Sequence, residues 1–131
     1  MNIGFDAKRA YFNKSGLGNY SRFIIDSLVR FEPKNKYFLF VPKMGSKLFS
    51  ANVYNNCQEV YPDGIIDRLF PSYWRSYSSS KHASKLKLEV FHGLSGEVPF
   101  GISKKGIKTI GIVNVVGSAI SREVDSGIYL H

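Results

Sequence analysis

The sequence is poor in cysteine and acidic residues and has no long apolar run, and these shortages exclude whole classes of protein. The one cysteine, Cys57, cannot form a disulfide within the chain or build a cysteine-based zinc site. No stretch approaches the roughly 18 consecutive apolar residues of a membrane-spanning helix. Asp6 and Lys8 interrupt the only early apolar run, which therefore does not resemble a signal peptide. We expect a cytoplasmic protein.

What the chain does contain is typical of one globular domain. Its 131 residues are enough for a real core, with 44% hydrophobic and 21% charged residues. Aromatic residues reach 15%, with ten Phe and eight Tyr, which predicts an aromatic-rich core.

The basic excess is the unusual bulk property. Eighteen Lys and Arg against ten Asp and Glu give a net charge of +8. Such a charge attracts nucleic acid, anionic lipid or phosphorylated small molecules, and it is equally compatible with a solvated surface that has no partner. The basic residues are scattered in small groups, and no helix-turn-helix, zinc-finger or RNP pattern occurs, so we expect no nucleic-acid partner.

Strand-like and helix-like patterns alternate along the first half of the chain. Residues 3–5 form a short apolar strand, and 18–31 have the spacing of a helix that Pro33 ends. Residues 37–41 are a continuous apolar run, typical of a strand buried on both faces. The side chains at helical spacing, which we expect on the buried face, are Tyr20, Phe23, Ile24, Leu28 and Phe31.

The second half continues the alternation. We expect strands at 58–61, 88–92 and 108–116, and a helix over 71–82 that begins at Pro71 and buries Trp74. A short helix fits within 43–56. The whole pattern predicts a single α/β domain with a Rossmann-like parallel sheet and helices on both faces. Ligands of such sheets bind beyond the carboxyl ends of the strands, which directs attention to the loops 6–18 and 92–99 and to the chain after Val116.

Two glycines, Gly16 and Gly18, stand just before the first long helix, in the segment NKSGLGNYSR. The dinucleotide-binding pattern G-x-G-x-x-G is incomplete, because Ser21 occupies the third position, and G-K-[ST] is absent. Two interpretations remain open. The glycines allow a turn with close helix packing, or they let a phosphate or sugar approach the positive end of the helix.

Two segments in order resemble the N-terminal domain of group 1 (family 4) retaining glycosyltransferases of the GT-B fold. IGFDAKRAYFNKSGLGNYSRFIIDSL matches the family's opening strand and glycine-rich loop, and VFHGLSGEVP matches a later strand and loop. The resemblance covers roughly residues 1 to 110, and VDSGIY at 124–129 is more weakly similar to a helix start of the family. It implies transfer of a sugar from a nucleotide-sugar donor to a glycan or lipid-linked acceptor, without a metal or another cofactor.

The resemblance also implies roles for individual residues. His92 is the catalytic candidate, with a structural histidine as the alternative, and Glu97 and Asn114 would line the cleft. Relatives usually have a His-Asp pair where this chain has Asn114 and Val115, which puts catalysis from that strand in doubt. Lys8 and Arg9 could equally be a solvated pair. The residues expected to bind phosphate or the acceptor are Gly16, Leu17, Gly18, Asn19, Lys8 and Arg9.

A GT-B enzyme carries its donor site, with paired glutamates spaced E-x7-E, on a second domain. Glu97, Glu123 and Asp125, near the end of this chain, do not have that spacing among themselves. We therefore expect residues 1–131 to be the acceptor-side domain, truncated before the donor-binding domain and inactive alone. The alternatives are a non-catalytic α/β binding module, or a basic domain that docks on anionic lipid at the inner face of the membrane.

Overall fold

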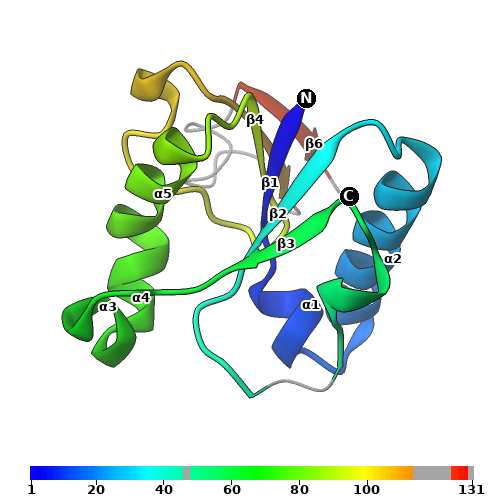
Figure 1. The fold of residues 1–131 in the computed structure, drawn as a ribbon, viewed down its shortest axis with the longest axis horizontal. Helices are drawn as coiled ribbons and strands as arrows, with labels where there is room; N and C mark the ends of the chain where they lie inside the picture. Colours follow the sequence, from blue (N-terminus) through cyan, green and yellow to red (C-terminus); the bar gives the residue numbers. More distant parts are fainter. Residues whose placement is uncertain (46–47, 114–124, 130–131) are drawn as a thin grey trace.

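The computed structural model of the chain describes residues 1–45, 48–113 and 125–129, and its centre is one parallel sheet (Figure 1). Five strands form an all-parallel arrangement in the order β3-β2-β1-β4-β5, and β6 adds to it beside β5. This is the order of Rossmann-like folds, so the predicted α/β class is confirmed. The strands are β1 (Asn2–Asp6), β2 (Lys36–Phe40), β3 (Cys57–Val60), β4 (Val90–Gly93), β5 (Lys108–Val113) and β6 (Ser126–Tyr129).

Helices cover both faces of the sheet, as a parallel sheet with apolar strands requires. On one face lie α1 (Lys8–Phe12) and α2 (Gly16–Phe31). On the other, α3 (Ile65–Leu69) is followed by a longer helical rod (Figure 1). The rod consists of α4 (Pro71–Tyr73), a π-helical turn (Trp74–Ser78) and α5 (Ser79–Lys85). Short 3-10 turns occur at Ala51–Val53 and Ser103–Lys105. No helix in the described part of the chain is long and apolar enough to cross a membrane.

The core has two parts, one on each face of the sheet, and both contain aromatic rings as predicted. Under the α4–α5 rod, the fully buried Trp74 stacks on Phe40, with ring centroids 6.0 Å apart, and Phe40 meets Phe91 edge-on at 5.3 Å. Under α1 and α2, Phe5 stacks with Tyr37 at 6.1 Å. Burying a large ring contributes about 1.5–3 kcal/mol, so these clusters provide much of the folding free energy.

The predicted buried face of α2 is only partly right, because Ile24 and Leu28 are half-buried against the core but the three aromatic residues of the set are exposed. Phe23 and Phe31 are 66% and 82% exposed, and the helix instead buries Ile25 and Val29, in line with the small residues at 18 and 21. The reason is that α2 packs closely against α1 and the sheet. A narrow stripe of small and branched residues at intervals of three and four fits that contact, and large rings do not.

One further expectation needs correction, and one helix was not expected. Residues 126–129, expected near a helix start, form the parallel strand β6 beside β5. Its position is set by Asp125, whose Oδ2 accepts hydrogen bonds from the backbone N–H (2.6 Å) and the hydroxyl (3.0 Å) of Thr109. The helix α3 was not predicted at all. The strand expected over 108–116 is observed at Lys108–Val113, and its remainder lies outside the described residues.

Candidate functional site

The candidate site lies where β1 and β4 are neighbours in the sheet. The chain proceeds from β1 toward β2 on one side, whereas β4 leads to β5 on the other. Ligands of open parallel sheets bind at such a reversal, beyond the carboxyl ends of the strands. Here these ends are Asp6 of β1 and the His92–Gly93 pair of β4.

The segments that follow the two strands touch each other. The backbone N–H of Arg9 donates to Oγ of Ser95 over 3.4 Å, and that hydroxyl donates to the carbonyl oxygen of Asp6, also over 3.4 Å. Nη2 of Arg9 comes within 3.9 Å of the position that a Cβ would occupy on Gly96. The start of α1 and the loop 94–97 are therefore one structural unit.

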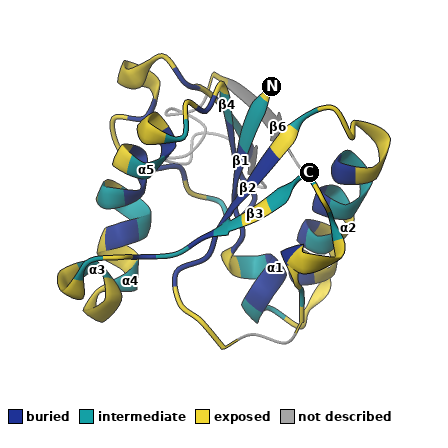
Figure 2. Cartoon of the chain, in the orientation of Figure 1, coloured by how far each residue is buried: buried dark blue, intermediate teal, exposed yellow. Residues whose placement is uncertain are grey.

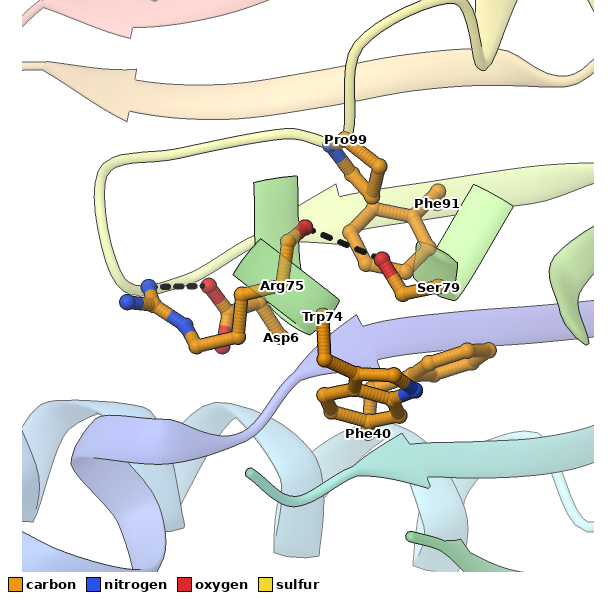
Figure 3. Close-up of a pocket in the computed structure, with 7 residues that line it drawn as sticks. All are labelled: Asp6, Phe40, Trp74, Arg75, Ser79, Phe91 and Pro99. Atoms are coloured by element: carbon orange, nitrogen blue, oxygen red, sulfur yellow. Dashed lines mark hydrogen bonds and ion pairs between the residues drawn. The ribbon is translucent and has the colours of Figure 1, made fainter. Parts of the chain in front are cut away.

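An ion-pair network underlies this unit. Nη2 of Arg75 lies 2.8 Å from Oδ2 of Asp6 (Figure 3). The same nitrogen lies 3.3 Å from Oε2 of Glu97. The Arg75 and Asp6 side chains are only 8% and 7% exposed, whereas that of Glu97 is 60% exposed. Burial opposes the charge of Arg75 most strongly, but the two carboxylates outweigh it and raise the pKa of the guanidinium. Oδ1 of Asp6 also accepts the backbone N–H of Lys8 over 3.2 Å.

A small hollow lies beside Arg75, against the rings of the core (Figure 3). It has room for about one water molecule, so a sugar does not fit. Nε of Arg75 and Nε1 of Trp74 are buried and have no hydrogen-bond partner in the described part of the chain. The ion pair therefore supports the loop 94–97 from its buried side. A ligand would contact the solvent-exposed side of that loop. The lining residues are Asp6, Phe40, Trp74, Arg75, Ser79, Phe91 and Pro99.

His92, the catalytic candidate, is at the expected edge of the sheet but its side chain is buried. It is 8% exposed, and its ring lies 5.7 Å from that of Phe5. Nε2 has no hydrogen-bond partner among the described residues. Burial lowers the pKa of the imidazole to about 4, because the charged form is poorly solvated. His92 is thus neutral at pH 7, and its catalytic role stays a prediction.

We expect His92 to make the fold sensitive to acid. The unfolded chain takes up a proton near the ordinary pKa of 6.5, whereas the folded chain does so only near 4. Stability should therefore fall as the pH drops from about 6.5 to about 4, by about 2–3 kcal/mol between pH 7 and 4.5. Urea unfolding at several pH values measures this, and His92→Phe should show a loss smaller by that amount. Equal losses in both proteins would contradict the burial of a neutral imidazole.

The two glycines of the opening segment have different surroundings. A Cβ on Gly18 would lie 1.8 Å from the carbonyl oxygen of Asn13, whereas a Cβ on Gly16 would meet nothing within 4 Å. Arg22 reinforces the packing at Gly18, since Nη1 donates to the carbonyl oxygens of Ala10 (2.8 Å) and Asn13 (2.9 Å). Gly18 and Arg22 thus join the start of α2 to the end of α1. This observation favours close helix packing as the reason for Gly18.

The remaining residues of that segment face outward. Gly16, Leu17 and Asn19 are exposed, and the side-chain oxygen of Asn19 accepts a hydrogen bond of 2.6 Å from Arg22. No hydrogen bond or ion pair among the described residues joins these three to the loop 94–97. The phosphate-binding role of Gly16, Leu17 and Asn19 therefore stays a prediction.

The other predicted site residues divide between the site and its surroundings. Glu97 belongs to the loop 94–97, Arg9 lies beside that loop, and Lys8 is exposed at the start of α1. Asn114 lies outside the described residues. Glu89 and Glu97 happen to be spaced E-x7-E, but they lie at opposite ends of β4. Oε2 of Glu89 accepts the backbone N–H of Asn2 at the amino edge of the sheet, so the two carboxylates cannot form a pair.

Sequence reasoning did not identify Asp6, Ser95 and Arg75. Asp6 had a usable signal, because a charged residue that ends an apolar strand of a parallel sheet lies at the ligand edge. Arg75 had no such signal, since its partner Asp6 is 69 residues away in sequence. No group of three or more His, Cys, Asp or Glu side chains in residues 1–45, 48–113 and 125–129 could hold a metal ion, and metal independence remains a prediction.

Comparisons with protein-family models, with curated proteins and with solved structures give no match to this chain.

Proposed function

We propose that this chain is the acceptor-side domain of a retaining glycosyltransferase that uses a nucleotide-sugar donor. One observation carries the proposal. The two segments that resemble the family meet at the reversal point of the sheet, where Ser95 contacts Arg9 and the carbonyl of Asp6, 86 and 89 positions away in sequence. The contact brings both parts of the resemblance to the edge where ligands of open parallel sheets bind.

The exposed groups around this contact suit a sugar ligand. Glu97 presents an exposed carboxylate that can accept hydrogen bonds from hydroxyl groups. Arg9, which approaches Gly96, and the exposed Lys8 before it add positive charge at the same edge of the sheet. Positive charge favours an acidic acceptor or the pyrophosphate of the leaving nucleotide, on which charge develops during transfer. In this proposal the donor is held chiefly by a second domain, and the chain alone does not turn over.

The proposal is tested by amide NMR titration of the chain with glycans, with short polyprenyl phosphates and with nucleotide-sugars. We expect acceptor compounds to shift the signals of residues 6–9 and 92–97, nucleotide-sugars to bind weakly, and no glycosyl transfer to occur. Arg9→Gln should weaken acceptor binding about tenfold, which corresponds to one charge-assisted hydrogen bond of about 1.4 kcal/mol. Shifts confined to other surfaces, or turnover by the chain alone, would contradict it.

A matched control separates this local effect from the overall charge. Lys34 is exposed and precedes β2, at the opposite edge of the sheet. Lys34→Gln removes the same charge as Arg9→Gln and should leave acceptor binding unchanged. If both variants weaken binding equally, general electrostatics and not a site at the β1–β4 edge would be responsible.

A non-catalytic binding module is the second candidate, and the state of His92 favours it. A buried, neutral imidazole is a poor general acid at pH 7. Acceptor binding at 6–9 and 92–97 that persists without any transfer, even when a donor domain is supplied as a separate protein, would favour this candidate.

A further inference from the structure

An exposed apolar surface stands out on the side of the molecule that carries α3 and α4. Figure 2 shows α3 and much of α4 as exposed, and α3 buries none of its residues. We call this the α3–α4 surface, and its large apolar side chains are between 49% and 77% exposed. They are Ile65, Ile66, Leu69, Phe70, Tyr73, Tyr77 and Phe100.

Six of these side chains are joined into one patch. Ile66, Leu69, Phe70 and Tyr73 line a shared shallow hollow. The patch continues through two ring contacts. The centroids of Tyr73 and Tyr77 are 5.2 Å apart, and those of Tyr77 and Phe100 are also 5.2 Å apart. The backbone N–H of Phe100 donates to the carbonyl oxygen of Ser76 over 2.7 Å, which fixes Phe100 beside the helix. Soluble proteins seldom expose a contiguous patch of this kind without a partner.

Basic side chains lie on the elements that carry the patch and next to them. Arg68 lies on α3, Lys104 shares a hollow with Phe100, and Lys105 follows it. All three are exposed, as are Lys81 and Lys85 of α5. Two acidic residues occur in the same region. Oδ1 of Asp67 accepts a hydrogen bond from Ser78, and Asp63 pairs with His82 at 3.4 Å. The surroundings are positive, in keeping with the net charge of +8.

We infer that the α3–α4 surface docks on an anionic lipid membrane. Protein interfaces are depleted in Lys, whereas lipid-bound surfaces combine apolar side chains that enter the bilayer boundary with Lys and Arg beside anionic headgroups. Tyrosines suit the same boundary, since the ring is apolar and the hydroxyl reaches water. The inference does not depend on sugar transfer. The helical rod also carries Arg75, so docking would bring the β1–β4 edge near the lipid surface.

Vesicle sedimentation tests the inference with the whole chain. We expect the protein to sediment with vesicles of phosphatidylcholine and about 30% phosphatidylglycerol, and poorly with pure phosphatidylcholine, since headgroup attraction supplies part of the affinity. Binding should weaken as salt rises from about 0.05 to 0.5 M, because salt screens that attraction. The triple variant Ile66→Ser/Leu69→Ser/Phe100→Ser should lose binding at least about tenfold, because it removes apolar area that would enter the bilayer.

Two matched controls accompany the triple variant. Phe23→Ser/Phe31→Ser removes two rings from α2 that are more exposed than Phe100, and this variant should bind vesicles normally. Lys104→Gln/Lys105→Gln should weaken binding, whereas Lys34→Gln/Lys36→Gln, at the opposite edge, should not. Circular dichroism confirms folding. Absence of binding to anionic vesicles, equal loss in the α2 control, or self-association that the triple variant abolishes while vesicles are ignored would each overturn the inference. None of these results bears on acceptor binding at the β1–β4 edge.

Discussion

Replacing Arg75 with methionine should lower the free energy of unfolding by about 3–5 kcal/mol. The change leaves the Asp6 carboxylate in a site where its side chain is only 7% exposed, without the cation 2.8 Å away. An uncompensated buried charge costs far more than the lost packing of a side chain of similar length. Urea unfolding followed by circular dichroism measures the effect, which should appear as a lower midpoint with an unchanged slope.

Two companion variants test whether the buried pair is responsible. Asp6→Asn/Arg75→Met removes both charges and should be much less destabilising than the sum of the single changes, since contacting residues are not additive. Glu97→Gln breaks the outer, exposed contact with Arg75 and should cost about 1 kcal/mol or less. If Arg75→Met cost no more than Glu97→Gln, the Asp6–Arg75 pair would not support the edge of the sheet.

Gly18→Ala should be the most disruptive single methyl addition in the opening segment, with a loss of about 3 kcal/mol or more. The new Cβ would lie 1.8 Å from the carbonyl oxygen of Asn13, 2.6 Å from its carbon and 3.1 Å from the carbonyl oxygen of Arg9. All three are backbone atoms, so α2 must move away from α1 to relieve the contact. Thermal and urea unfolding report the loss of stability.

Gly16→Ala is the matched control, because nothing lies within 4 Å of its new Cβ. It should be neutral or stabilise the helix by up to about 1 kcal/mol. The same variant decides between the two interpretations of the glycine pair. If a phosphate or sugar approaches the backbone there, Gly16→Ala will fold normally and bind the ligand more weakly. Equal stability losses at both positions would show that the packing at Gly18 is not the cause.

Much of the fold was predictable from local pattern. The strands expected at 37–41 and 58–61 match β2 and β3 within one residue. The first was predictable because a parallel strand buried on both faces is a continuous apolar stretch. The fold class followed from the alternation of such strands with helical spacing. The patterns failed where a segment's face is chosen by its neighbours, as in α2, or where a strand joins only by pairing, as in β6.

The candidate site was predictable only in part, for the same reason. His92 could be placed near the carboxyl edge because it ends an expected strand, and Arg9 and Glu97 because they are in the segments that follow expected strands. The protonation state of His92 and the contacts of Glu97 could not be predicted. The low pKa of His92 comes from burial by distant segments, and Glu97 is held by Arg75.

The sequence by itself determined the parallel α/β architecture, the positive charge and the edge of the sheet at which a ligand would bind. These follow from interactions between near neighbours in the chain and from composition. Only the tertiary structure paired Asp6 with Arg75, gave Gly18 a packing role and left Gly16 open. It also gathered α3, α4 and Phe100 into one exposed apolar surface. Each of these depends on which distant segments the sheet order brings together, and no local pattern encodes that order.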